Sequence, residues 1–351
     1  MVQPVYLRVR PWLRSSSSLP NAFAKPPSAG EGRPEQLSAS SAWRFAEEGG
    51  KVVLEQPLEE THHGWRIVSN GDIVVGVDQS PEARWAVRWG AREARLRGAT
   101  LALAHVRSSV SDDRAVDDLD SEAETLLIVR AAEASELEPE ISVAPRLYES
   151  GSISEQLIEL SGAADLLVLG VASARPRAEH GVLGPLEDRV VVHAHCPVVT
   201  VNGPGPIVGQ DYDKIVLGWT EGTTARGALE AAAEEAMLRG SLLSIVTIPP
   251  SATPSPALPS ERINVEEALI DSMRRIESSY PGLRIDVTHR TGQVDTELER
   301  SLDRADLLVL GSHHSEQPWS IRVGPIAEEL MRRSPCPVML VGRQARRQRT
   351  N

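Results

Sequence analysis

The sequence is poor in cysteine and has no long apolar run. Two cysteines among 351 residues exclude a disulfide framework, and one in each half of the chain excludes a cysteine-rich metal site. No apolar stretch reaches the roughly 18 to 20 residues that a membrane-spanning helix requires. The arginines near the N-terminus are not followed by the apolar segment of a secretory signal. These absences predict a cytoplasmic protein without a membrane partner.

Positive charge is also in deficit. The chain has 37 Lys and Arg residues against 49 Asp and Glu residues, a net charge of -12 and a pI near 5.3. Binding to a phosphate backbone requires clustered cations, so no nucleic-acid partner is expected. The basic cluster in residues 344–351 is interpreted as a solvated C-terminal tail.

A long internal repeat organises the chain. The segment Asp165–Gly170 reads Asp-Leu-Leu-Val-Leu-Gly and recurs letter for letter as Asp306–Gly311. Each copy is followed by a Gly-Pro pair and then by Cys-Pro-Val. A period of about 141 residues is too long for a solenoid and suits a whole domain, so the chain is predicted to be a tandem duplication.

The two copies define the predicted domains. Residues 1–65 show no sustained periodicity and include the run Ser15–Ser18, which predicts a largely disordered extension, with short ordered pieces left open at residues 51–54 and 65–68. The remaining predicted parts are a first domain (66–203), a linker (204–212), a second domain (213–343) and the tail. An alternative that the sequence leaves open is that residues 1–65 are not expressed.

Within each repeat, short apolar runs alternate with helical patterns. The first run, Asp72–Asp78, has the composition of a buried parallel strand. Ser80 and Pro81 then supply an N-cap and a first helical residue, and Gly98 ends the helix. Strand and helix continue to alternate, which predicts two doubly wound, Rossmann-like α/β domains with parallel sheets.

In an open α/β sheet, ligands bind beyond the carboxyl ends of the strands at the point where the strand order reverses. In the first repeat that point lies between Gly76–Asp78 at the end of strand one and Gly170 at the end of strand four. A carboxylate there suits a ribose or a base, and backbone N–H groups of the loop that reaches Gly184 suit phosphates.

The motifs Gly-Val-Asp-x-Ser, Asp-Leu-Leu-Val-Leu-Gly and Cys-Pro-Val, in this order, resemble the universal stress protein family in its tandem form. The resemblance covers residues 72–201 and 213–341. It implies small stress-response proteins that dimerise, some of which bind ATP. It also implies that the last strands, residues 198–201 and 338–340, pair antiparallel across a pseudo-two-fold axis. In that arrangement Cys196 and Cys336 lie too far apart for a disulfide.

The nucleotide-binding members of the family carry an aspartate after strand one and a valine ending strand two. Their loop after strand four reads Gly, two residues, Gly, nine residues, Gly, then Ser or Thr. In the first repeat Ser173 stands at the second glycine and Pro185 at the hydroxyl residue, with one extra residue in the loop. The residues carried over from the family as candidates for nucleotide binding in the first domain are Gly76, Asp78, Val106, Gly170, Ser173 and Gly184.

The second repeat departs further from the family pattern. Gly311 and Gly324 keep the spacing, but His314, Pro325 and Thr220 replace the middle glycine, the hydroxyl residue and the aspartate. A proline in place of the hydroxyl residue removes two hydrogen-bond donors, the side-chain hydroxyl and the backbone N–H, and each lost donor costs on the order of 1 to 3 kcal/mol. The loss of both weakens nucleotide binding about a hundredfold or more. In the first loop, Arg175 and Arg177 could restore some attraction for phosphate, although solvated loop positions are the more common interpretation.

The sequence therefore predicts a stress-response or regulatory protein with degraded nucleotide sites, not an enzyme. Its cofactor would be ATP, bound weakly by the first domain, and no metal is expected. Self-association is expected as a pseudo-dimer within the chain, and a dimer of chains is left open. One alternative is an ATP-binding switch that uses the first domain alone. Another is a weak ATPase, for which Asp78 is the one identifiable carboxylate.

Overall fold

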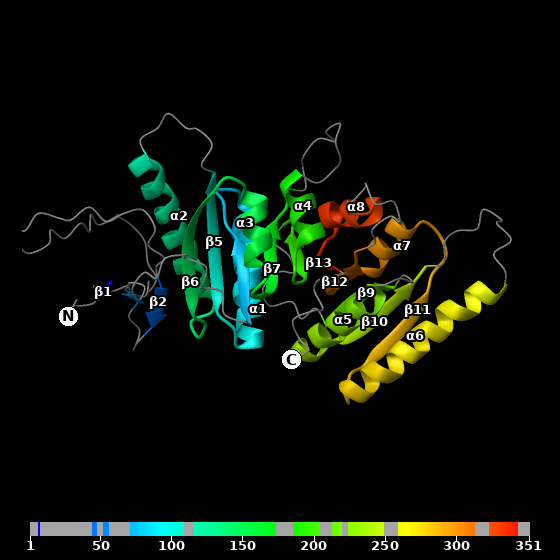
Figure 1. Cartoon of the computed structure of the whole chain (residues 1–351). Helices are drawn as coiled ribbons and strands as arrows, with labels where there is room; N and C mark the ends of the chain where they lie inside the picture. Colours follow the sequence, from blue (N-terminus) through cyan, green and yellow to red (C-terminus); the bar gives the residue numbers. More distant parts are fainter. Residues whose placement is uncertain are drawn as a thin grey trace, which may run out of the picture.

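The computed structural model is an elongated α/β protein in which two similar halves stand side by side (Figure 1). It describes residues 6–7, 44–47, 52–55, 71–108, 116–172, 185–203, 213–219, 224–248, 259–312 and 323–342. Its main sheet has ten strands, five from each half, in the order β11-β10-β9-β12-β13-β8-β7-β4-β5-β6.

The elements of the first half are β4 (Asp72–Gly76), α1 (Pro81–Arg97), β5 (Leu101–Ser108), α2 (Val116–Leu137), β6 (Val143–Ser150), α3 (Ile153–Leu160), β7 (Ala164–Gly170), α4 (Pro185–His193) and β8 (Val198–Val201). Those of the second half are β9 (Lys214–Trp219), α5 (Ala225–Arg239), β10 (Leu242–Thr247), α6 (Pro259–Ser279), β11 (Ile285–His289), α7 (Val294–Ser301), β12 (Ala305–Gly311), α8 (Pro325–Arg333) and β13 (Val338–Val341). Strands pair in parallel within each half. The predicted pair of doubly wound domains is confirmed.

Helix α1 shows how local sequence sets the elements. The Ser80 hydroxyl accepts a hydrogen bond from the Ala83 N–H, and Pro81 occupies the first turn, where its missing N–H has no helical partner to lose. Gly98 ends the helix in the left-handed conformation with φ of 61°, which glycine adopts without steric cost. Trp85 and Trp89, four residues apart on α1, are partly buried and pack against the core.

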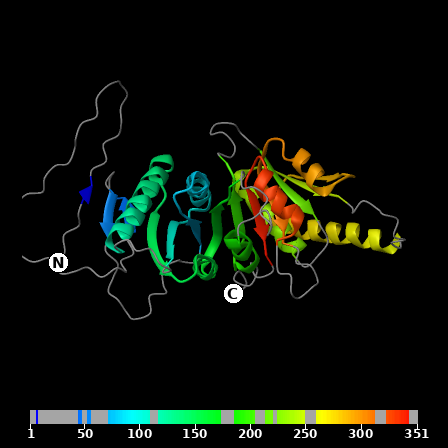
Figure 2. The same ribbon diagram turned by 90° about the horizontal axis from the view of Figure 1, so that it is seen from above.

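Two apolar cores lie on opposite faces of the sheet, and each continues from one half into the other. One core contains buried residues of α1, α2, α5 and α6, and the other contains buried residues of α3, α4, α7 and α8. Seen from above, helices lie on both sides of the twisted sheet (Figure 2). Because each core crosses the boundary between the halves, the two domains share one folded unit.

The halves join through antiparallel pairing of β8 with β13, as the family resemblance implies. Val338 pairs with Thr200, and Leu340 pairs with Val198. Beside this seam, the Asn202 side chain donates to the backbone oxygens of Arg332 at 2.9 Å and Ser334 at 3.0 Å, at the end of α8. The predicted intramolecular pseudo-dimer is confirmed.

The cysteines are free and buried, as expected. Continuing the register of β8 and β13 places Cys196 level with Gly342 and Cys336 level with Asn202. Six residues of strand separate the two levels, which amounts to roughly 20 Å at about 3.4 Å per residue. Burial raises the pKa of Cys336 to about 11, and it also raises that of Cys196, so both thiols are kept protonated near neutrality.

A separate sheet of three short strands lies in the N-terminal segment. Its strands are β1 (Tyr6–Leu7), β2 (Arg44–Glu47) and β3 (Val52–Glu55), in the antiparallel order β1-β3-β2. These strands lie within the predicted extension, and β3 overlaps residues 51–54, which the sequence leaves open as a short ordered piece; the valines at the start of β3 favour extended backbone. The domain boundaries given by the sequence stay predictions.

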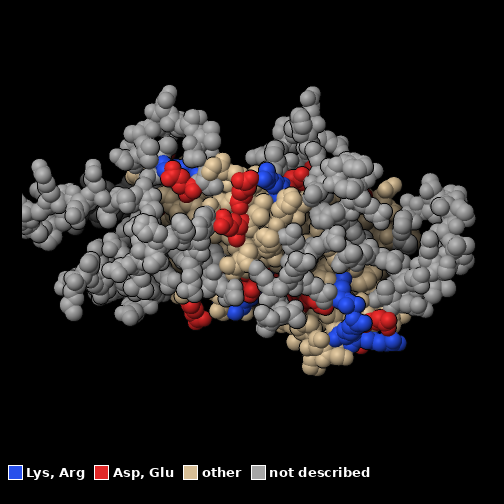
Figure 3. Space-filling model, in the orientation of Figure 1, with Lys and Arg blue, Asp and Glu red and all other residues tan. Residues whose placement is uncertain are grey.

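Figure 3 shows side chains of both signs in small neighbouring groups on one face of the described surface. Among the described residues, no helix is long and apolar enough to cross a bilayer.

Candidate functional site

The candidate site lies where the strand order of each half reverses. In the first half β4 pairs with β7, and in the second β9 pairs with β12, each in parallel. The carboxyl ends of these strands and the N-terminus of the following helix therefore meet at one edge of the sheet. This is the location that the sequence predicts.

Asp78 is exposed and forms the turn that begins α1. Its Oδ1 accepts a hydrogen bond from the Ser80 N–H at 2.9 Å and a second from the Ser80 hydroxyl. The same hydroxyl accepts from Ala83 N–H at 3.1 Å and so caps α1. The carboxylate is thereby held at the surface, in the turn between the end of β4 and the start of α1.

Gly76 ends β4, and Val106 lies on the neighbouring strand β5, two residues before its end. A Cβ on Gly76 would lie 2.9 Å from Leu169 Cδ2, so glycine allows β4 and the Leu169 side chain to approach closely. Val106 is buried and pairs in register with Tyr148 on β6. Burial raises the pKa of Tyr148, and the charge of Arg146 opposes that shift. Sequence reasoning did not single out Tyr148, which strand pairing alone brings beside Val106.

The structure gives Gly170 a packing role. A Cβ at this position would lie 2.4 Å from the Glu82 carbonyl carbon and 2.5 Å from the Ala83 nitrogen. The first turn of α1 thus leaves no space for a side chain at the end of β7. Of the other candidates in the first domain, Ser173 and Gly184 lie outside the described residues, as do Arg175 and Arg177.

Gly311 occupies the corresponding place in the second half. A Cβ there would lie 2.6 Å from Thr224 Oγ1. The Thr224 hydroxyl donates instead to the Ser312 backbone oxygen at 3.2 Å, so it ties the start of α5 to the end of β12. Gly324 is the N-cap of α8 and has no side chain to cap that helix. Thr220 and His314 lie outside the described residues.

A cavity of about 210 Å³ lies at this edge of the second half. Among the residues that line it, five belong to strands and Ile248 directly follows β10; the strand residues are Gly218, Trp219, Val246, Leu310 and Gly311. The helical residues are Val294 and Leu298 of α7, together with Gly324–Ala327 at the start of α8. Gly311 and Gly324, which the sequence predicts as parts of one site, therefore do line the same cavity. Its apolar lining was missed, because it is assembled from five separate elements.

One contact links the first half to this edge of the second. Asp188, in the first turn of α4, accepts a hydrogen bond from the Val323 backbone N–H at 3.0 Å. Val323 is buried and directly precedes Gly324. The position of the α8 N-terminus thus depends on contacts with the first domain as well as on contacts within the second domain.

Within the described part of the chain, no group of three or more His, Cys, Asp or Glu residues could hold a metal ion.

The chain matches the family model of the universal stress protein family over residues 70–202 and 211–342. It belongs to that family. A universal stress protein of Mycobacterium tuberculosis is 26% identical over 289 residues, which cover 76% of this chain and 95% of the relative. A second from the same organism is 25% identical over 292 residues, covering 78% of this chain and 97% of the relative.

The fold is also shared with a solved structure. A universal stress protein from Archaeoglobus fulgidus superposes with a TM-score of 0.60 at 17% identity, over 78% of this chain and 98% of that chain. The family resemblance and its tandem arrangement are therefore confirmed.

Proposed function

We propose that this universal stress protein is a cytoplasmic stress-response regulator whose first domain binds ATP weakly. The observation that carries the proposal is the difference between the two strand-reversal edges. The first presents the fixed carboxylate of Asp78 beside the end of β4, with Val106 buried two residues before the end of β5. In the second, the described lining of the corresponding cavity is apolar.

Asp78 is placed to accept hydrogen bonds from ribose hydroxyls or a base, because the turn to Ser80 holds it at the surface. Val106 supplies an apolar contact for a base. Pro185 at the start of α4 provides no N–H for a phosphate, which supports weak rather than tight binding. The loss of two donors would lower affinity by about a hundredfold relative to an intact site.

A regulatory role is favoured over catalysis. Asp78 Oδ1 already accepts two hydrogen bonds from Ser80, so this oxygen is engaged in the turn that begins α1 and not in orienting an attacking water molecule. A weak ATPase is retained as the enzymatic alternative, and an ATP-dependent switch within the first domain as the regulatory one. A dimer of chains would use surfaces other than β8 and β13, which already pair within the chain.

Calorimetric titration of the full chain with ATP tests this proposal. We expect at most one weak site, and Asp78→Ala should reduce its affinity about tenfold or more, since a hydrogen bond to a charged group contributes roughly 1.5 to 3 kcal/mol. The matched control is Asp286→Ala, an exposed aspartate on β11. Phosphate release in the same samples measures turnover.

Two equivalent tight sites, or a single site indifferent to Asp78→Ala, would contradict the proposal. Sustained phosphate release that disappears in Asp78→Ala would favour the ATPase instead.

A further inference from the structure

The cavity of the second domain has a lining that fits poorly with a nucleotide. Its described residues are glycine, alanine, proline, tryptophan and larger aliphatic residues, with no charged or hydroxyl-bearing side chain among them. A buried charge without a partner is strongly disfavoured in such surroundings. The triphosphate of a nucleotide would find no cation among these described side chains.

Its size sets the scale of an occupant. A dry apolar cavity of about 150 Å³ accommodates benzene. The cavity here, at about 210 Å³, is somewhat larger. It is open on one side, and its enclosed part would hold the body of a bicyclic aromatic molecule.

The rim of the cavity also carries an exposed apolar residue. Ile326 at the start of α8 is 41% exposed, one of the few large hydrophobic residues so exposed in the described part of the chain. The corresponding turn of α4 in the first half follows the same Gly-Pro pair and has Leu186 at the position of Ile326, but it has Glu187 at the position of Ala327. The first turn of α8 therefore lacks an acidic side chain that α4 carries, at a position that lines the cavity.

The rim also offers a limited number of hydrogen-bond donors. The first N–H groups of a helix have no acceptor within that helix. In α8, Pro325 has no N–H and Gly324 has no capping side chain, which leaves the N–H groups of Ile326 and Ala327 at the edge of the cavity. They can donate to one oxygen of a molecule whose body lies in the apolar space.

We propose that the second domain binds an uncharged aromatic molecule of about bicyclic size, with a single hydroxyl or carbonyl oxygen directed toward the start of α8. The cavity occupies the place of a nucleotide site, but its described lining has the chemistry of an apolar one. The two domains would then respond to different classes of small molecule.

Calorimetric titration of the full chain with 2-naphthol, which is neutral at pH 7, tests the inference. We expect one saturable site per chain that AMP does not displace. Ala327→Leu places a larger side chain at the cavity wall and should weaken binding at least tenfold. Ile326→Glu, at an exposed rim position where misfolding is not a concern, should weaken it severalfold. As a control, Ala132→Leu makes the same alanine-to-leucine change on the exposed side of α2, and it should leave binding unchanged.

The inference is overturned if 2-naphthol shows no saturable binding, if neither cavity variant weakens it, or if AMP displaces it. Asp78→Ala separates this outcome from the proposed function, because it should weaken ATP binding and leave 2-naphthol binding intact. Failure of the naphthol titration alone would leave the nucleotide site of the first domain standing.

Discussion

The two domains share a framework and differ at its ligand-binding edge. Strands β7 and β12 have the same six residues from Asp to Gly, show the same alternation of burial and pair with equivalent neighbours. The residues at the carboxyl ends of the strands differ, however. Asp78 comes two residues after the glycine that ends β4, whereas Thr220 stands at the corresponding position of the second repeat, directly after Trp219 at the end of β9. Packing on both faces constrains a central strand, whereas the loops beyond it can change without disturbing the core.

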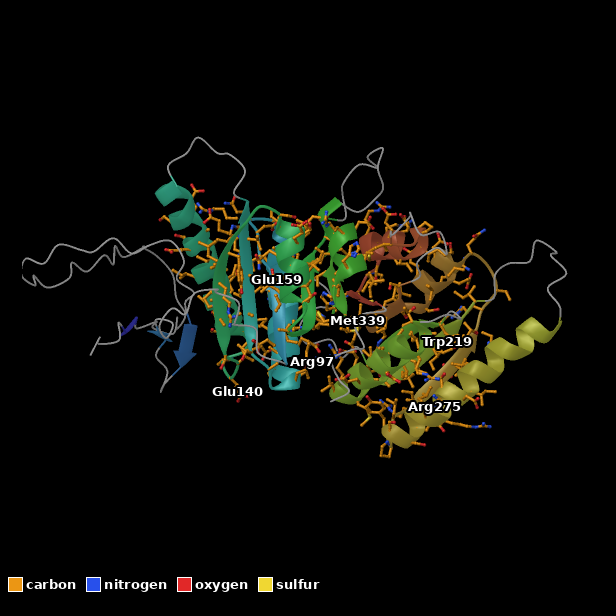
Figure 4. The ribbon with its side chains drawn as sticks, in the orientation of Figure 1. Arg97, Glu140, Glu159, Trp219, Arg275 and Met339 are labelled. Atoms are coloured by element: carbon orange, nitrogen blue, oxygen red, sulfur yellow. The ribbon has the colours of Figure 1, made fainter. Side chains whose placement is uncertain are left out.

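The two domains also meet through a near-symmetrical cluster of buried charges. Glu93 and Arg97 of α1 face Glu235 and Arg239 of α5, and each glutamate pairs with both arginines. Both glutamates are 1% exposed. Figure 4 shows Arg97 on the side of α1 that faces α5. Burial disfavours the charge of Glu93, but the two arginines more than offset it and lower its pKa.

The largest predicted effect comes from breaking this cluster. Glu93→Ala leaves two buried guanidinium groups competing for one buried glutamate and should destabilise the protein by about 3 to 5 kcal/mol. Glu235→Ala should cost a similar amount if the two halves contribute equally. Urea unfolding measures both, and Asp271→Ala, which breaks an exposed pair with Arg274, is the control at about 1 kcal/mol or less. If Glu93→Ala lowered the free energy of unfolding by no more than the control does, the cluster would not hold the domains together.

The second prediction compares Gly170 with Gly311, which end identical strands. Gly170→Ala would bring its Cβ against the backbone of α1, which cannot move without shifting the helix. Gly311→Ala would meet chiefly the Thr224 side chain, which can rotate or be removed. We expect losses of about 3 kcal/mol for the first and about 1 kcal/mol for the second, within the range for overpacked sites.

Urea unfolding again provides the measurement. Thr224→Ala should recover part of the loss in Gly311→Ala, while Gly203→Ala, where no atom lies within 4 Å of the added Cβ, is the neutral control. Equal losses at the two glycines would mean that the strand ends are packed alike, contrary to the geometry.

Most of the fold could be predicted from the sequence, because each signal was local or repeated. The apolar run at β4, the cap at Ser80 and the stop at Gly98 each act on neighbouring residues, and the repeat supplied the second domain. The antiparallel pairing of β8 with β13 came through the family resemblance and not from local pattern. Residues 51–54, which overlap β3, were left open as a short ordered piece, whereas β1 and β2 were not expected, because an isolated short strand has little periodicity to detect.

The site was less predictable, because its properties depend on contacts between distant elements. Gly170 matched a nucleotide-binding pattern, yet its space is limited by the backbone of α1. The charge cluster had a visible signal in the recurrence of Glu-Ala-x-Leu-Arg-Gly at Glu93 and Glu235, but sequence alone does not show that the two helices face each other. Ser173 and Gly184 stay predictions.

The smallest predicted effect concerns Asp306, which opens the segment that is identical in both domains. Burial raises the pKa of Asp306 from its ordinary value of 3.8 to about 6, Arg239 opposes the shift, and the charge of Asp213 adds to it. Because the folded-state pKa lies above the unfolded-state value, the stability that this proton contributes is present below about pH 4 and is lost as the pH rises through about 6.

Asp306→Asn cannot ionise, so its melting temperature relative to the parent protein should be higher at pH 7.5 than at pH 4.5. The group is only partly buried, so we expect the difference to correspond to about 1 kcal/mol or less after solvent screening. Thermal melts across this pH range measure it, with Asp165→Asn in the identical segment as the matched comparison. Parallel pH profiles for Asp306→Asn and the parent protein would show that the surroundings of β12 do not perturb this carboxyl group.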